Sequence, residues 1–171
     1  MDQPLSSDAI RLLDERDRSL QAYLSAASPQ SAHATITLLG DSTDEELGRV
    51  PLPQGDARQL KFTVEGTVQV NNGATAYAGQ PTVVVWLWSS SGTPWTYITA
   101  EAANSISNTS GSDTSYLSPG TSLFERNASG NYTAGEMVVA KANMGTVSGG
   151  ANVSFDVDIV VTISPVSEFT S

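Results

Sequence analysis

The sequence predicts a mainly β fold: an antiparallel β-sandwich of jelly-roll-like topology, preceded by a short N-terminal helix. Two observations predict the sandwich. From Gln59 onward, apolar and polar residues alternate with a period of two, as in strands that bury one face. Clusters rich in Gly, Ser, Asn and Pro separate the apolar runs, which is typical of turns between short strands. A third observation, a helical period with dense charge in the first 28 residues, predicts the helix.

The helix is expected over residues 7–27. Ser7 is a suitable N-cap, and Pro29 ends the helix because a proline disfavours helical geometry in the residue before it. Salt bridges are expected between Arg11 and Glu15 and between Asp14 and Arg18, which are four residues apart. Five residues recur at alternating spacings of three and four, the pattern of a coiled-coil seam: Ile10, Leu13, Asp17, Leu20 and Leu24.

This seam predicts that residues 1–28 form an oligomerisation or docking helix. A helix of under about 20 residues is marginal alone in water, so it needs a contact surface. Copies of the helix would bury the seam, leave the charged run at 14–18 outside, and use Asp17 to fix register and copy number. The alternative is an amphipathic helix that lies on its own β domain.

Residues 29–58 are expected to be a linker with a first strand and a loop. The strand is the segment 33–40, and the loop is 41–57, where Pro51 and Pro53 argue against regular structure. Residues 59–171 are expected to form the sandwich, with about seven or eight strands. The segment 104–122, rich in Ser, Thr, Asn and Gly, is expected to be a long exposed loop suited to recognition.

Two long strands are expected to bury alternate side chains. In the first, Gly66 falls in step with the inward side chains and marks a bend. The inward residues are Leu60, Phe62, Val64, Val68 and Val70, and, in the last strand, Val153, Phe155, Val157, Ile159, Val161 and Ile163.

Composition excludes several classes of partner. The net charge is −10 with only eight Lys and Arg among 171 residues, so nucleic acid and anionic membrane surfaces are poor partners. The longest apolar run, residues 83–88, is too short for a membrane helix, so no membrane insertion is expected. The start of the chain lacks the basic and apolar regions of a signal peptide. There is no Cys, hence no disulfide and no thiolate metal site.

No catalytic residue, metal site or cofactor is expected. The only histidine, His33, lies in a Ser- and Ala-rich stretch and is interpreted as a solvated side chain of the linker. Asp156 and Asp158 lie two apart on one strand and share its polar face. A pair of carboxylates suffices for glycoside hydrolysis, but acids that keep an exposed sheet face soluble are the favoured interpretation. The chain is therefore expected not to be an enzyme.

Four aromatic residues form a second candidate site. They lie on two successive strands across a Ser- and Gly-rich turn, and could cluster on one sheet face: Trp86, Trp88, Trp95 and Tyr97. An exposed cluster would suit stacking against a sugar, whereas a buried cluster would belong to the core or to a subunit interface. The core or the interface is favoured, because strand 82–88 is apolar on both faces.

The segment 10–25, with its Asp-Glu-Arg-Asp-Arg run, resembles the openings of minor tail proteins of tailed bacteriophages, especially those of actinobacteria. The whole layout is similar to phage fibre, tail-tip and capsid-decoration proteins. The resemblance implies a virion structural protein, in the tail rather than the capsid. It implies a homotrimer that binds other phage structural proteins, and it leaves open contact with host surface glycan. A capsid decoration, head-fibre or jelly-roll shell protein and, from another class, a carbohydrate-binding module are the alternatives.

Overall fold

The computed structural model describes residue 8 and residues 11–18, 29–53, 59–73, 75–125, 136–145, 147 and 152–166. Residues 8 and 11–18 are helical. The other described segments contain ten strands: β1 Gln30–Leu39, β2 Glu45–Pro51, β3 Gln59–Val70, β4 Ala78–Gly79, β5 Thr82–Trp88, β6 Pro94–Glu101, β7 Ile106–Ser107, β8 Thr114–Glu125, β9 Met137–Met144 and β10 Ser154–Pro165.

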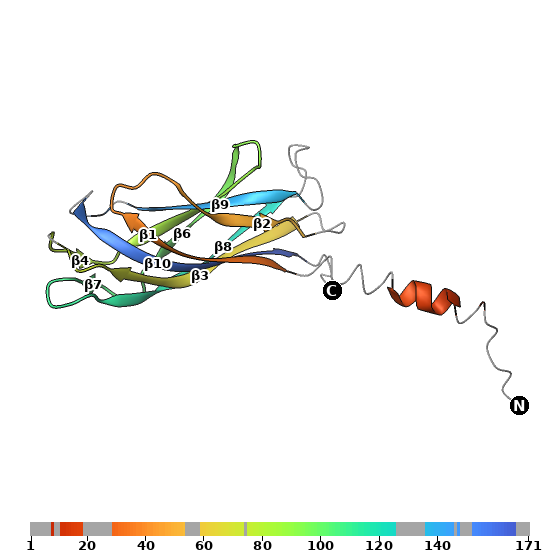
Figure 1. Cartoon of the computed structure of the whole chain (residues 1–171), viewed down its shortest axis with the longest axis horizontal. Coiled ribbons are helices and arrows are strands. Elements are labelled where there is room, and N and C mark those ends of the chain that lie inside the picture. Colours follow the sequence, from red (N-terminus) through yellow and green to blue (C-terminus); the bar gives the residue numbers. More distant parts are fainter. Residues whose placement is uncertain are drawn as a thin grey trace, which may run out of the picture.

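The strands form two four-stranded antiparallel sheets packed face to face (Figure 1). Sheet A has the order β1-β10-β3-β8, and sheet B has the order β2-β9-β5-β6. Among these eight strands the first pairs with the last, the second with the last but one, and so on inward to the β5–β6 hairpin. A hairpin of strands rolled up in this way is a jelly roll, so the expected fold class is confirmed. The short strands β4 and β7 pair separately at one end.

The core lies between the sheets and follows the alternation of the sequence. All five inward side chains expected in β3, from Leu60 to Val70, are fully buried, as are Phe155, Val157, Ile159 and Ile163 in β10. On the side where β6 lies next to β8, the Thr96 and Ser122 hydroxyl oxygens are 2.8 Å apart and hydrogen-bonded, which ties sheet B to sheet A.

Two expectations from the sequence were wrong. Residues 45–51, expected within a loop, form β2, which pairs along β9, and β1 pairs along β10. Residues 30–51 are thus part of the sandwich, not a linker to it. The segment 104–122, expected as an exposed loop, contains β7 and most of β8. In both places Pro or Gly falls at a strand end or a bulge, where the regular pairing of the strands is already interrupted and such residues are tolerated.

Burial of one phenol affects its ionisation. Desolvation raises the pKa of Tyr77 above its ordinary value of 10.0, because the apolar surroundings penalise the phenolate. The unfolded chain therefore loses this proton first, and Tyr77 should contribute a fall in stability as the pH rises above about 10.

One buried amide holds the end of the sandwich together, and replacing it should be costly. The Asn108 side-chain oxygen accepts from the Tyr77 backbone N–H at 2.8 Å, and its nitrogen donates to the Asn71 and Thr75 carbonyls at 3.0 Å each. We expect Asn108→Ala to lower the free energy of unfolding by about 2–3 kcal/mol, because it orphans buried backbone groups. Urea unfolding with the exposed Asn104→Ala as control would measure it; equal midpoints would contradict the role.

Candidate functional site

The N-terminal helix is the first candidate site. Every described residue of the helix is exposed, and Figure 1 shows the helix lying apart from both sheets. Leu12 is 61% exposed and Leu13 50%, so neither leucine packs on the sandwich. The alternative in which this helix lies on its own domain is therefore not what the structure shows.

Part of the expected seam can be located. Leu13 and Asp17 both lie on the helix and are exposed, whereas Ile10, Leu20 and Leu24 lie outside the described residues. The expected ion pair between Arg11 and Glu15 is present, with Nε and Oε1 3.8 Å apart. Within residues 11–18 no ion pair joins Asp14 to Arg18. The charged run at 14–18 therefore belongs to a helix whose described residues are exposed and do not pack on either sheet.

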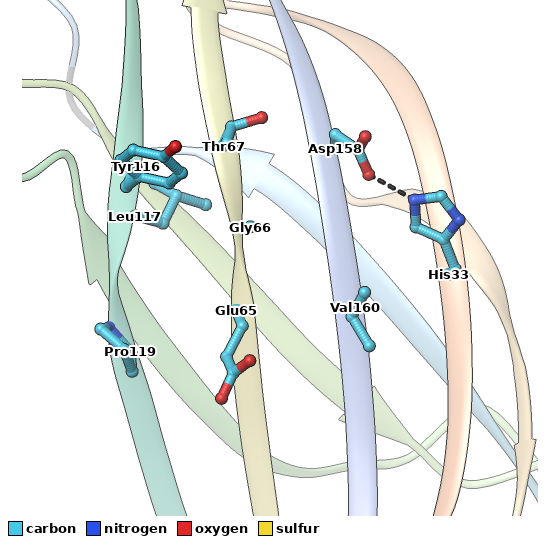
Figure 2. A pocket seen from close by; sticks show the side chains of 9 residues that line it. All are labelled: His33, Glu65, Gly66, Thr67, Tyr116, Leu117, Pro119, Asp158 and Val160. Carbon is cyan, nitrogen blue, oxygen red and sulfur yellow. Dashed lines mark hydrogen bonds and ion pairs between the residues drawn. The ribbon is translucent and has the colours of Figure 1, made fainter.

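The second candidate site is a hollow on the outer face of sheet A, which we call the acidic hollow (Figure 2). It has a volume of about 570 Å³ and crosses all four strands of the sheet. Its lining residues are His33, Glu65, Gly66, Thr67, Tyr116, Leu117, Pro119, Asp158 and Val160.

A β-bulge shapes the hollow. Between Val64 and Gly66 the pairing of β3 with β8 shifts, so that one residue of β3 faces two of β8, Ser118 and Pro119. Gly66 lies so close to β10 that a Cβ atom built on it would be 2.0 Å from the Asp158 carbonyl oxygen. The backbone of β3 thus lies close to β10 at Gly66. Tyr116 and Pro119 belong to β8, on the other side of β3 from β10 (Figure 2).

Polar side chains of the hollow pair across strands. His33, expected as a solvated side chain of a linker, lies in β1 and is hydrogen-bonded through Nε2 to Asp158 of β10. The neighbouring carboxylate of Asp156 accepts from Thr37 at 2.6 Å and from Asn71 at 2.9 Å. These aspartates do share the polar face of β10, and they tie it to its neighbours, which explains why they lie there.

Glu65 stands apart from these pairs. Its carboxylate makes no hydrogen bond or ion pair within the described part of the chain. The lining of the hollow contains two carboxylates, one imidazole and no Lys or Arg. The hollow therefore suits a ligand that donates hydrogen bonds or has positive charge, and Tyr116, 74% exposed, offers such a ligand an aromatic ring.

The third candidate site is the outer face of sheet B, where two of the four expected aromatic residues meet. Trp86 and Tyr97 are paired in the β5–β6 register, with ring centroids 4.6 Å apart and planes at 36°. Tyr97 is 55% exposed, and Trp86 is half-buried. Lys141 of β9 places its Nζ 4.5 Å from the ring centroid of Trp88.

The other two aromatic residues lie in different surroundings. Trp88 is partly buried beneath Lys141, and its indole N–H is buried without a hydrogen-bond partner among the described residues. Trp95 lies where the pairing of β5 with β6 shifts, and it packs partly against the core. The exposed aromatic surface is thus the Trp86–Tyr97 pair with Lys141 beside it, which we call the aromatic face.

Neither a metal site nor a catalytic triad is found in the described segments. They contain no group of three or more His, Asp or Glu side chains placed to hold a metal ion. None of their helices is long and apolar enough to cross a membrane. Within them His33 has Asp158 as its hydrogen-bond partner, and no serine nucleophile completes that pair into a triad.

Sequence reasoning missed the acidic hollow. Glu65 and Tyr116 are far apart in the chain, and Tyr116 falls in the segment that the sequence predicts to be a loop. An exposed tyrosine in a Ser-rich segment is the available signal, but only the β3–β8 pairing places it beside Thr67.

The fold defines the class of this domain as a jelly-roll β-sandwich with an exposed N-terminal helix. No protein-family model and no curated protein matches the chain. Solved structures that resemble it include a chain of infectious bursal disease virus Gx strain (10% identity, TM-score 0.46, 82% of this chain and 33% of that one). A chain of the T13 viral particle of the same virus gives 13% identity, TM-score 0.41, and 81% and 31% coverage. This chain spans about a third of their length, and so weak a likeness carries no argument about function.

Proposed function

We propose that this chain is a non-enzymatic structural protein of a virion, joined to its neighbours through its N-terminal helix. The observation that carries the proposal is the exposure of Leu12 and Leu13 on a helix that packs on neither sheet. So short a helix is marginal alone in water and gains stability only when its apolar side chains are covered. A partner protein or further copies of the chain would supply that cover.

The structure of the sandwich favours a function in which the protein acts by binding other molecules through its surface. Its polar side chains pair across strands, as His33 does with Asp158 and Thr37 with Asp156. Jelly rolls occur in viral capsid and lectin domains, which is an analogy at the level of the fold. Both kinds of domain act by binding surfaces. The proposed body is therefore a rigid unit that presents such surfaces, while the helix attaches it to its neighbours.

The resemblance of the N-terminal segment to minor tail proteins favours the tail of a tailed phage, as a tail-tip or short-fibre component, with the seam forming a trimer. A capsid decoration, head-fibre or jelly-roll shell protein is the alternative. Gold labelling of the chain on intact particles would test this placement. Label at the tail is expected, label over the head would favour the alternative, and particles without label would overturn the virion proposal.

Removing residues 1–28 should abolish assembly and leave the sandwich folded, since residues 30–166 contain the whole core cluster of the described residues. Multi-angle light scattering at micromolar concentration would compare the full chain, expected to be a trimer, with the shortened chain, expected to be a monomer. The control is circular dichroism, where the β signal should be unchanged. A shortened chain that keeps its full stoichiometry would place the interface on the sandwich instead.

A second function, binding of host surface glycan, is favoured by the aromatic face. A half-exposed ring pair with a cation beside it resembles the stacking surfaces that sugars use. We expect Tyr97→Ala to reduce binding on a glycan array at least tenfold, and Trp88→Ala to reduce it less. The matched control is Leu123→Ala, which removes an exposed apolar side chain from the other sheet, outside the acidic hollow. Equal loss in the Tyr97 and Leu123 variants, or in neither, would contradict the site.

A further inference from the structure

We propose that the acidic hollow of one copy receives Leu12 and Arg16 from the N-terminal helix of a neighbouring copy. The inference rests on the proposed function, because it names the surface against which the helix packs. The expected coiled-coil seam would bury Leu13 in a helix bundle, but it would not bury Leu12. Leu12 lies off that seam and is the more exposed of the two, at 61%.

Leu12 and Arg16 form one patch of the helix. They are four residues apart, so they stand on the same face one turn from each other. Arg16 makes no ion pair or hydrogen bond within the described residues, whereas Arg11 is paired with Glu15. The patch thus combines an exposed apolar side chain with a guanidinium that has no partner among the described residues, and a bundle formed through the seam would leave it on the outside.

The hollow offers matching groups. The carboxylate of Glu65 has no partner within the described part of the chain, and Asp158 adds a second carboxylate to the same lining. Tyr116 and Val160, 74% and 39% exposed, provide apolar surface in the same hollow (Figure 2). A guanidinium can hydrogen-bond to a carboxylate and stack on an aromatic ring at the same time, which a lysine ammonium does less well.

Charge and size both favour this occupant. No Lys or Arg lines the hollow, so an anionic ligand would meet the Glu65 carboxylate, which has no partner within the described part of the chain. Its volume of about 570 Å³, within the roughly 300–1,000 Å³ of small-molecule pockets, leaves room for both side chains. A second copy is the occupant we infer, because in the single chain the helix lies apart from sheet A and its described residues are exposed.

The absence of Cys from the chain permits a direct test by disulfide trapping. We would mix full-length Leu12→Cys with full-length Tyr116→Cys, oxidise the mixture, and identify the linked peptides by mass spectrometry. Both positions are exposed, so neither substitution should disturb folding. The expected product is a dimer whose disulfide joins the first variant, at its helix, to the second, at its hollow. The matched control pairs Leu13→Cys with Tyr116→Cys, because a seam residue should link mainly to its own kind.

A second measurement tests the charges. Arg16→Gln and Glu65→Gln should each weaken self-association about tenfold by sedimentation equilibrium, and the double variant should be little worse than either alone. Glu101→Gln, an exposed carboxylate of sheet B, should leave association unchanged.

The outcomes separate this inference from the proposed function. If removal of residues 1–28 abolishes assembly but Leu12→Cys links only to itself, the helix is the assembly device and the hollow is not its partner. If the doubly substituted Leu12→Cys, Tyr116→Cys chain closes within a monomer, the helix folds back on its own body and the second copy is excluded. A full chain that is monomeric in every measurement overturns this inference and the expected trimer, and leaves a partner protein as the cover of the helix in the proposed function.

Discussion

Replacing Gly66 with alanine is expected to lower the free energy of unfolding by about 3 kcal/mol or more, a large effect for a single added methyl group. The added Cβ would stand 2.0 Å from the Asp158 carbonyl oxygen and 3.0 Å from the Ile159 Cα. Both are backbone atoms of the paired strand β10, so no side-chain rotation relieves the clash. The strands must separate at the centre of sheet A.

Two other glycines provide graded controls. A Cβ at Gly73 would have the Asn71 carbonyl oxygen as its nearest neighbour, at 3.9 Å, which is ordinary contact, so little change is expected. At Gly120 the obstacle at 2.0 Å is the Ile98 Cγ2, a side-chain atom that can move, so an intermediate loss of about 1–3 kcal/mol is expected. Urea unfolding would rank the three. Equal stability of the Gly66 and Gly73 variants would contradict the close approach of β3 and β10.

Replacing Phe155 with alanine is expected to cost about 3–5 kcal/mol. Phe155 is fully buried between the sheets, and its ring meets that of Tyr77 edge to face, with centroids 5.1 Å apart and planes at 88°. The substitution leaves a cavity and also removes the ring pair, which is worth about 0.5–1.5 kcal/mol beyond the buried area. Because Tyr77 lies outside sheet A, in the segment before β4, the loss should loosen that end of the sandwich.

The control for Phe155 is Leu123→Ala, an apolar truncation at a side chain that is 55% exposed on β8. It should change stability by less than about 1 kcal/mol. A double-mutant cycle of Phe155→Leu with Tyr77→Leu would isolate the ring contact from the cavity. Additive losses in that cycle would show that the two rings do not interact, and a mild Phe155→Ala would show that the residue is not in the core.

Sequence patterning predicted the central strands well. β3 and β10 alternate apolar and polar residues over most of their lengths, and β5 was expected at residues 82–88, where it lies. These strands are buried on one or both faces, so burial imposes a pattern on the residues themselves. The helix at residues 11–18 was predicted for the same reason, by its helical period.

The edges were predicted poorly. β2 contains Glu45, Glu46 and Gly48, and the start of β8 reads as a Ser-rich loop. Edge strands are half-exposed and tolerate bulges, so polar residues and Gly are common in them and the apolar alternation of core strands is missing. What makes them strands is hydrogen bonding to β9 and β3, partners that lie far away in the sequence.

By itself, the sequence determined the fold class, the two long core strands and a charged helix with a seam of apolar residues, because each of these is a local pattern imposed by water on one face of an element. Only the tertiary structure decided that His33 meets Asp158, that Glu65 and Tyr116 share one hollow, and that of four aromatic residues Trp86 and Tyr97 form the exposed pair. Those neighbours come from different strands, most of them far apart in the chain, and the register between such strands is set by the whole core rather than by any one segment.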